Sequence, residues 1–270
     1  MKWTNEATGR TIEIYNEDCL EAMDKLIESG IKIDAIITDP PYGTTACKWD
    51  SIIPFDKMWK RLNKLIKPNG AIVLFGSEPF SSALRMSNIR DYKYDWIWEK
   101  DRGTNFLQAQ YQPMKIHENI LVFSNNKTVY NPQKYIPKSP NSIARMRRKL
   151  SNIKRLQGKQ YNIEGVQKKD FNPLKYPESI IYFNRKTGNN QFYNDYIKHS
   201  TQKPIALMEY LIQTYTNENE LVLDFTMGSG STGVACMKTN RNFIGIELDK
   251  DYFKATCKRL DDHFNQQSLF

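Results

Sequence analysis

The tetrapeptide Asp39-Pro40-Pro41-Tyr42 carries groups that can hold a flat, amino-bearing ring. It follows the apolar run 33–38, which predicts a buried strand. The two prolines fix φ and favour an extended residue before them, so the strand ends in a stiff loop. That loop presents the Asp39 carboxylate and the Pro40 carbonyl as acceptors, with the Tyr42 ring as a stacking face. The pattern predicts a site for a planar amino-base, and a plain strand-ending turn is the alternative.

A glycine-rich turn forms the second candidate site. The apolar run 221–224 ends at Asp224, and a Gly-x-Gly-x-x-Gly pattern begins at Gly228, before a helix-like stretch. This arrangement lets a backbone approach a nucleotide closely. No Gly-Lys-Ser/Thr follows, which excludes a Walker loop. A second apolar run, about twenty residues beyond Asp224, ends at Glu247, where a carboxylate suits ribose hydroxyls. The pattern indicates an adenosine-carrying ligand, with an ordinary tight turn and a surface glutamate as the alternative.

Two further motifs complete a recognisable pattern. Thr201-Gln202-Lys203-Pro204 precedes the helix that leads to the glycine turn, and Asp18-Cys19 follows another predicted strand, 11–15. Together the four motifs resemble the DNA amino-methyltransferases that act on adenine N6 or cytosine N4 with S-adenosyl-L-methionine. Their order, with the Asp-Pro-Pro-Tyr motif first and the glycine turn last, resembles the permuted β group of that family. The resemblance covers roughly residues 11–124 and 199–264.

The resemblance implies a role for each matching residue. Catalysis would rest on Asp39, Pro40, Pro41 and Tyr42, and Tyr42 would stack on a base flipped out of double-stranded DNA. No metal is needed, because the methyl group on a sulfonium is already activated. The residues expected to hold the cofactor are Asp18, Cys19, Thr201, Lys203, Asp224, Thr226, Gly228, Ser229, Gly230, Glu247 and Leu248.

The chain departs from the family pattern within the glycine turn. The usual Asp-Pro-Phe is Asp-Phe-Thr here, with Phe225 and Thr226 in the second and third places. An aromatic contact to the cofactor from position 226 is therefore not expected. Aspartate at position 39 favours adenine, since serine is commoner in the members that act on cytosine.

The positive charge is concentrated in one segment. The chain carries 39 Lys and Arg against 30 Asp and Glu, for a net charge of +9. Segment 131–198 holds 15 of these basic and four of these acidic residues, so it carries +11 and the remainder −2. This contrast favours a phosphate-contacting insert, with a solvated lysine-rich loop as the alternative. The side chains expected to contact DNA are Lys48, Arg145, Arg147, Arg148, Lys149, Lys154 and Arg155.

Strands alternating with helices predict a doubly wound, mainly parallel, Rossmann-like α/β sheet. In such sheets ligands bind at the carboxyl ends of the strands, where Asp18, Asp39, Asp224 and Glu247 all fall. We expect residues 1–130 to form the catalytic half of the core, 131–198 a basic target-recognition insertion, and 199–270 the cofactor-binding half. A basic helix is expected over 142–156. His117-Glu118 is interpreted as structural.

Composition indicates a cytoplasmic protein that reaches the nucleoid through DNA, encoded by a bacterium or a phage. No apolar stretch has the length of a membrane span, and the first residues lack a signal-peptide core. The four scattered cysteines predict reduced thiols and no zinc site.

The sequence leaves several partners and functions open. The favoured interpretation is an adenine-N6 methyltransferase of a restriction-modification system or an orphan enzyme. The alternatives are a cytosine-N4 or RNA methyltransferase and, from another class, a nucleic-acid-binding protein that has lost catalysis. A cognate restriction endonuclease is conceivable, and both a monomer and a homodimer are compatible with the sequence.

Overall fold

The computed structural model describes residues 1–6, 8–44, 50–136, 174–184 and 202–267. The chain separates into two compact units, of which one is Met1–Asn131 with Ser179–Phe270 and the other Pro132–Glu178. In the second unit Tyr135 and Lys175 form an antiparallel bridge. The helix expected over 142–156 lies outside the described residues. The first unit contains the predicted catalytic and glycine motifs.

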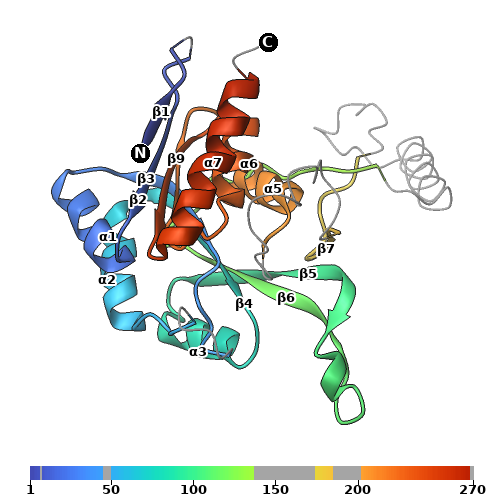
Figure 1. Cartoon of the computed structure of the whole chain (residues 1–270). Coiled ribbons are helices and arrows are strands. Elements are labelled where there is room, and N and C mark those ends of the chain that lie inside the picture. Colours follow the sequence, from blue (N-terminus) through green and yellow to red (C-terminus); the bar gives the residue numbers. More distant parts are fainter. Residues whose placement is uncertain (7, 45–49, 137–173, 185–201, 268–270) are drawn as a thin grey trace, which may run out of the picture. The chain divides into compact units, whose positions relative to one another are not determined.

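The first unit is built on a central sheet (Figure 1). Within the described residues the sheet has nine strands in the order β1-β2-β9-β8-β3-β4-β6-β5-β7. Neighbours from β2 through β9, β8 and β3 to β4 are parallel, whereas β6 is antiparallel to both β4 and β5. The strands are β1 (Lys2–Thr4), β2 (Thr11–Asn16), β3 (Ile33–Thr38), β4 (Ile66–Gly76), β5 (Tyr92–Thr104), β6 (Lys115–Phe123), β7 (Ile180–Tyr182), β8 (Leu221–Asp224) and β9 (Asn242–Glu247).

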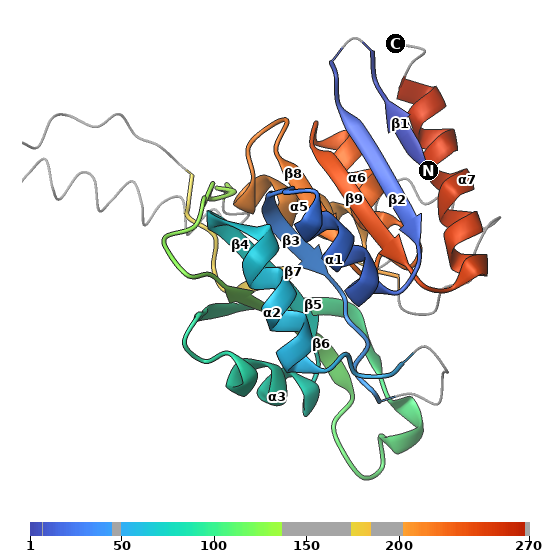
Figure 2. The same cartoon turned by 90° about the vertical axis from the view of Figure 1, so that its left-hand side faces the viewer.

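Helices cover both faces of this sheet (Figures 1 and 2). Helices α1, α2 and α3 pack on one face, and α5, α6 and α7 on the other. Ile36 and Ile37 of β3 belong to opposite core clusters, and both are fully buried. Burial on two faces explains why β3 is a continuous apolar run. The helices are α1 (Cys19–Glu28), α2 (Phe55–Leu65), α3 (Phe80–Ser87), the 3₁₀ turn η1 (Phe106–Gln108), α5 (Ile205–Tyr215), α6 (Ser231–Lys238) and α7 (Lys250–Gln267).

The expected doubly wound, mainly parallel sheet is confirmed, and the structure adds elements the sequence pattern did not indicate. These are strand β1, which at three residues is too short to show a period, and helix α3. The run 67–70, which contains Pro68 and Gly70, lies inside β4, where the pairing with β3 shifts register. Pro68 is accommodated at that irregularity. In the described part of the chain, no helix combines the length and the apolar character needed to cross a membrane.

Candidate active site at the carboxyl edge of the sheet

Three predicted site residues lie at the ends of neighbouring strands. Asp39 directly follows β3, Asp224 ends β8 and Glu247 ends β9. These strands run parallel in the order β9-β8-β3. The catalytic motif and the glycine turn therefore leave the sheet at the same edge, which is where α/β sheets bind their ligands.

Hydrogen bonds join the Asp39 loop, where catalysis is predicted, directly to the glycine turn. The Thr38 hydroxyl donates to Asp224 Oδ1 at 2.5 Å. The Thr226 hydroxyl lies 2.7 Å from Thr38 Oγ1 and donates to the Asp39 carbonyl at 3.1 Å. Burial raises the pKa of Asp224 to about 6, against hydrogen bonds that lower it. Thr226, which stands where the family usually has phenylalanine, thus ties the two motifs together.

The loop that carries Asp39 is held in place on both sides. The Tyr42 hydroxyl donates to Asp39 Oδ1, and the Tyr42 ring stacks on Phe80 of α3 with centroids 5.0 Å apart. Asp50 accepts hydrogen bonds from the backbone N–H groups of Gly43 and Thr44, at 2.8 and 2.9 Å. The Tyr42 ring is therefore fixed by its contact with α3 and by its bond to Asp39.

The second oxygen of Asp39 is engaged by a lysine from another motif. Lys203 Nζ donates to Asp39 Oδ2 at 2.6 Å and lies 3.1 Å from Glu118 Oε2. Lys100 Nζ in turn donates to Glu118 Oε1 at 3.0 Å. Burial raises the pKa of Asp39, and the Lys203 charge opposes that rise. Burial would also raise the pKa of Glu118, but the two ammonium groups outweigh it and hold this pKa at about 2.

The glycine turn is bent by two residues with positive φ, Gly228 at 51° and Gly230 at 73°. A Cβ atom at Gly230 would lie 2.5 Å from the Thr256 methyl carbon, so the turn packs closely on α7. The Thr256 hydroxyl donates to the Gly228 carbonyl at 2.7 Å. Arg259 of α7 is buried and donates to the Ser229 carbonyl, also at 2.7 Å. Helix α7 therefore fixes the shape of the turn.

Glu247 is oriented toward the same turn. Its carboxylate accepts the backbone N–H of Gly228 at 2.9 Å and that of Asp249 at 2.8 Å. Burial raises the pKa of Glu247, and these N–H bonds oppose the rise. The carboxylate and the bent glycine backbone lie side by side at the strand ends, an arrangement that suits a nucleoside. The residues present thus fit an adenosine-bearing cofactor.

The remaining predicted cofactor residues occupy more varied positions. Asp18 is the N-cap of α1, where its Oδ1 accepts the N–H groups of Leu20 and Glu21. Cys19 is half-buried, and burial raises the pKa of its thiol to about 12. Leu248 is 65% exposed beyond β9. Asp18 therefore has a helix-capping role that its position before a helix could have predicted.

Several predicted residues lie outside the described part of the chain. These are Lys48, Arg145, Arg147, Arg148, Lys149, Lys154, Arg155 and Thr201. Conversely, the sequence interpretation missed Lys100, Glu118, Phe80, Thr256 and Arg259. Glu118, beside His117, was interpreted as structural. Lys100 was expected, as part of the polar turn 100–105, to contact the DNA backbone, whereas the structure buries it against Glu118.

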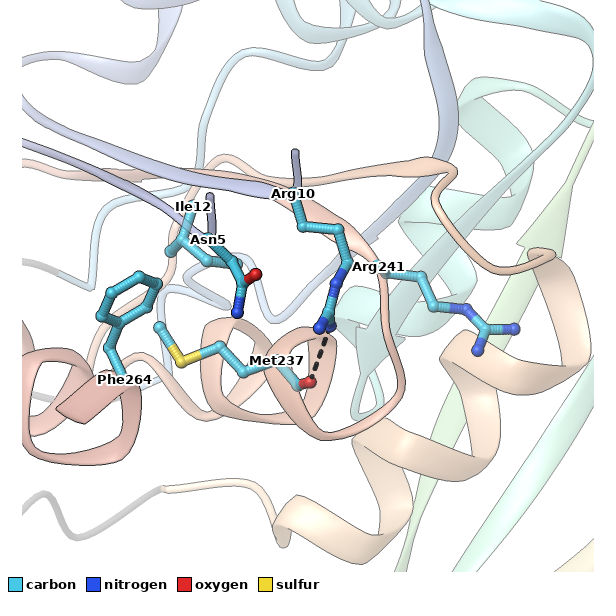
Figure 3. Close-up of a pocket in the computed structure, with 6 residues that line it drawn as sticks. All are labelled: Asn5, Arg10, Ile12, Met237, Arg241 and Phe264. Carbon is cyan, nitrogen blue, oxygen red and sulfur yellow. Dashed lines mark hydrogen bonds between the residues drawn. The ribbon is translucent and has the colours of Figure 1, made fainter. Parts of the chain in front are cut away.

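A small hollow away from these motifs lies where the β1–β2 hairpin meets α6 and α7 (Figure 3). Arg10 donates across it to the Met237 carbonyl at 3.4 Å, while the Arg241 side chain points away. The described residues that line it are Asn5, Arg10, Ile12, Met237, Arg241 and Phe264. None of these is a predicted site residue.

Comparisons with known proteins agree with the resemblance. The chain is 30% identical to the type II methyltransferase M.HpaI of Haemophilus parainfluenzae, over 92% of this chain and 74% of that protein. The crystal structure of the M1.HpyAVI–SAM complex superposes with a TM-score of 0.61 at 30% identity, covering 92% of this chain and 98% of that one. The PvuII DNA methyltransferase (cytosine-N4-specific) has the same fold, with a TM-score of 0.62 at 17% identity over 94% and 91% of the two chains. The family model described as DNA methylase matches residues 33–258, and the chain therefore belongs to the N6_N4_Mtase family of DNA methylases.

Proposed function

We propose that this DNA methylase transfers a methyl group from S-adenosyl-L-methionine to N6 of an adenine flipped out of double-stranded DNA. The observation that carries the proposal is the hydrogen bond from Thr226 to the Asp39 carbonyl. This bond joins the glycine turn, which suits the cofactor, to the Asp39 loop, which suits the base. A methyl donor and an amino acceptor bound at these two places would be neighbours, and proximity supplies much of the catalysis.

Asp39 and Pro40 would act on the target amine. The amino nitrogen of adenine is a poor nucleophile, because its lone pair is delocalised into the ring. If the Asp39 carboxylate and the Pro40 carbonyl each accept one N–H, the nitrogen becomes more pyramidal and the lone pair more available. The fixed carboxylate also stabilises the positive charge that develops on nitrogen, and more strongly in a dry site than in water.

Tyr42 would form one wall of the base site. Its ring is held by Phe80 and its hydroxyl by Asp39, so its plane is set before a base arrives. A preorganised stacking face offsets part of the cost of unstacking a base from the duplex. The proton released from the amine would pass to Asp39 or to solvent.

The cofactor would be held by the turn from Gly228 to Gly230 and by Glu247. The glycines allow close approach to the backbone, and the carboxylate suits ribose hydroxyls. S-adenosyl-L-methionine supplies an electrophilic methyl group on a sulfonium when it is bound. The protein's part would be to exclude water and hold the acceptor amine in line, which is the role proposed for Asp39 and Tyr42.

Adenine is proposed rather than cytosine because position 39 is aspartate, where the cytosine-N4 members of the family more often have serine. The fold does not distinguish the two, since the cytosine-N4-specific PvuII enzyme shares it. The test is to incubate duplex DNA with the enzyme and the cofactor, digest it to nucleosides, and identify the methylated product by mass spectrometry. N6-methyldeoxyadenosine is expected, and N4-methyldeoxycytidine would replace the proposal with its alternative.

A further inference from the structure

Four charges of alternating sign form a continuous row that ends at Asp39. The two lysines are buried, and the side chains of Asp39 and Glu118 are 26% and 16% exposed. The row runs from Asp39 to Lys203, from Lys203 to Glu118 and from Glu118 to Lys100, with contacts of 2.6, 3.1 and 3.0 Å. The side chains of Lys203 and Lys100 are 8% and 4% exposed. The formal charge of the row is zero. Each ion has a neighbour of opposite sign, which offsets part of the cost of removing it from water.

The sheet brings Glu118 and Lys100 to the active-site edge. Strand β6 runs antiparallel to β4, and Asn119 pairs with Gly76 at the carboxyl end of β4. Glu118, the preceding residue, therefore lies just past that end. Glu118 also pairs with Trp98 of β5, which places Lys100 two residues further along the same edge. Neither residue belongs to a motif, and the antiparallel register alone puts them beside Lys203.

The Lys203 ammonium group lies near three aromatic rings as well as two carboxylates. Its Nζ lies 5.0 Å from the Phe75 ring centroid, 5.9 Å from that of Tyr42 and 6.0 Å from that of Trp98. Aromatic faces attract a cation but fix its direction poorly. The two carboxylates, Asp39 and Glu118, therefore decide where the ammonium group lies. If Glu118 lost its charge, only Asp39 would hold it.

We propose that Glu118 is a positioning residue for methyl transfer: it holds the Lys203 ammonium in place and so fixes the orientation and charge of Asp39. Lys100 anchors Glu118 from the opposite side. The inference rests on the proposed function of Asp39 as an acceptor for the target amine. With Lys203 and Tyr42 each on a different oxygen of Asp39, the carboxylate has a single orientation toward an incoming base.

The charges that face Asp39 make the inference testable by pH. Burial raises the pKa of Asp39, Lys203 lowers it, and the Glu118 charge raises it. Tyr42 donates to Asp39 from its own loop, and Asp224 of β8 is a further carboxylate nearby. Removing the charge of Glu118 should therefore lower the pKa of Asp39. Removing the charge of Lys203 should raise it.

The experiment measures the single-turnover rate of DNA methylation against pH for wild type, Glu118→Gln and Lys203→Met. The acid limb, where the rate falls as Asp39 is protonated, should move to lower pH in Glu118→Gln and to higher pH in Lys203→Met. The plateau rate of Glu118→Gln should fall by about tenfold to a hundredfold, because Asp39 is less well placed. Glu99→Gln is the matched control, since Glu99 is exposed on β5 and its profile should overlay that of wild type.

Thermal melting and calorimetric cofactor binding establish that each variant is folded. If Glu118→Gln does not fold, Glu118→Asp takes its place. That variant keeps the charge, so its acid limb should stay at the wild-type pH while its plateau falls. The inference is overturned if the acid limb of Glu118→Gln lies at the wild-type pH or at a higher pH. It is also overturned if the acid limb of Glu118→Asp moves to lower pH. Asp39→Ala, measured in the same experiment, separates the acceptor role of Asp39 from the positioning role of Glu118. If Asp39→Ala is inactive while the acid limb of Glu118→Gln stays at the wild-type pH, only the positioning role fails.

Discussion

The Lys203 ammonium lies 2.6 Å from Oδ2 of Asp39, although 164 residues separate the two along the chain. The resemblance implied a cofactor contact for Lys203, and the structure places its Nζ on the carboxylate of the catalytic motif. The motif before α5 is thereby tied to the Asp39 loop, the proposed base side of the site. Because Lys203 precedes α5 and Asp39 follows β3, the pair also fixes α5 relative to the sheet edge.

Adding a methyl group at Gly230 should disturb the cofactor turn. The residue has φ of 73°, and a Cβ atom there would lie 2.5 Å from the Thr256 methyl carbon. Gly230→Ala should lower the free energy of unfolding by at least about 1–2 kcal/mol, the cost of positive φ for a residue with Cβ. It should also weaken cofactor binding in calorimetry.

Thr256→Ser provides the matched rescue for this change. Serine lacks the methyl group that the added Cβ atom at position 230 would meet, and it keeps the hydroxyl that donates to the Gly228 carbonyl. In the Gly230→Ala background it should restore part of the stability and affinity. If the double variant is no better than Gly230→Ala alone, contact with α7 does not shape the turn.

Asp224 should make the protein less stable as pH rises through the mildly acidic range. Its pKa is raised from 3.8 to about 6 in the folded protein. The folded state therefore binds more protons than the unfolded state between about pH 4 and pH 6, and stability falls with rising pH there. A shift of this size corresponds to on the order of 2–3 kcal/mol.

Denaturant unfolding of Asp224→Asn at several pH values checks this expectation. The variant should lose less stability than wild type between about pH 4 and pH 6, because it has no proton to release there. Asp251→Asn, an exposed change at the start of α7, should keep the wild-type slope. Parallel curves for Asp224→Asn and wild type would show that burial does not shift this carboxyl group.

The predicted basic insert should account for much of the salt dependence of DNA binding. Neutralising Arg145, Arg147, Arg148 and Lys149 together should weaken binding to all sequences. The slope of log affinity against log salt should flatten by up to about four units if all four contact phosphate. The measurement is duplex binding at several salt concentrations.

A control of equal charge comes from four exposed lysines of the first unit, three of them on α2. Neutralising Lys57, Lys60, Lys64 and Lys127 should leave the slope near that of wild type. Equal slopes for wild type and the insert variant would make the insert a solvated loop.

The sequence predicted those parts of the site that follow from strand ends. Asp39, Asp224 and Glu247 each follow an apolar run, and parallel strands place such ends on one edge. A continuous apolar run of strand length sufficed to predict these strands, because both of their faces are buried. The apolar residues of β5 and β6 predict strands only over 94–98 and 120–123, and the outer halves of both strands extend beyond them.

Long-range register was beyond the reach of pattern alone. Glu118 reaches Lys203 only because β6 is antiparallel and pairs Asn119 with Gly76, and no local signal specifies that pairing. The contact of Lys203 with Asp39 likewise depends on how α5 packs. In the sequence, Arg259 looks like any other charged residue of an amphipathic helix. Its hydrogen bond to the Ser229 carbonyl of the glycine turn depends on how α7 packs in the fold.

The central claim is tested most directly by the methylation rate and the cofactor affinity of Asp39→Ala, measured on the same preparation. The account predicts that transfer falls by a factor of about 10² or more, as when a preorganised group is removed from a charged transition state. Affinity for S-adenosyl-L-methionine should stay close to that of wild type, because Gly228 and Glu247 are unchanged. A variant that methylates duplex DNA at nearly the wild-type rate would contradict the assignment of Asp39 as the acceptor for the target amine.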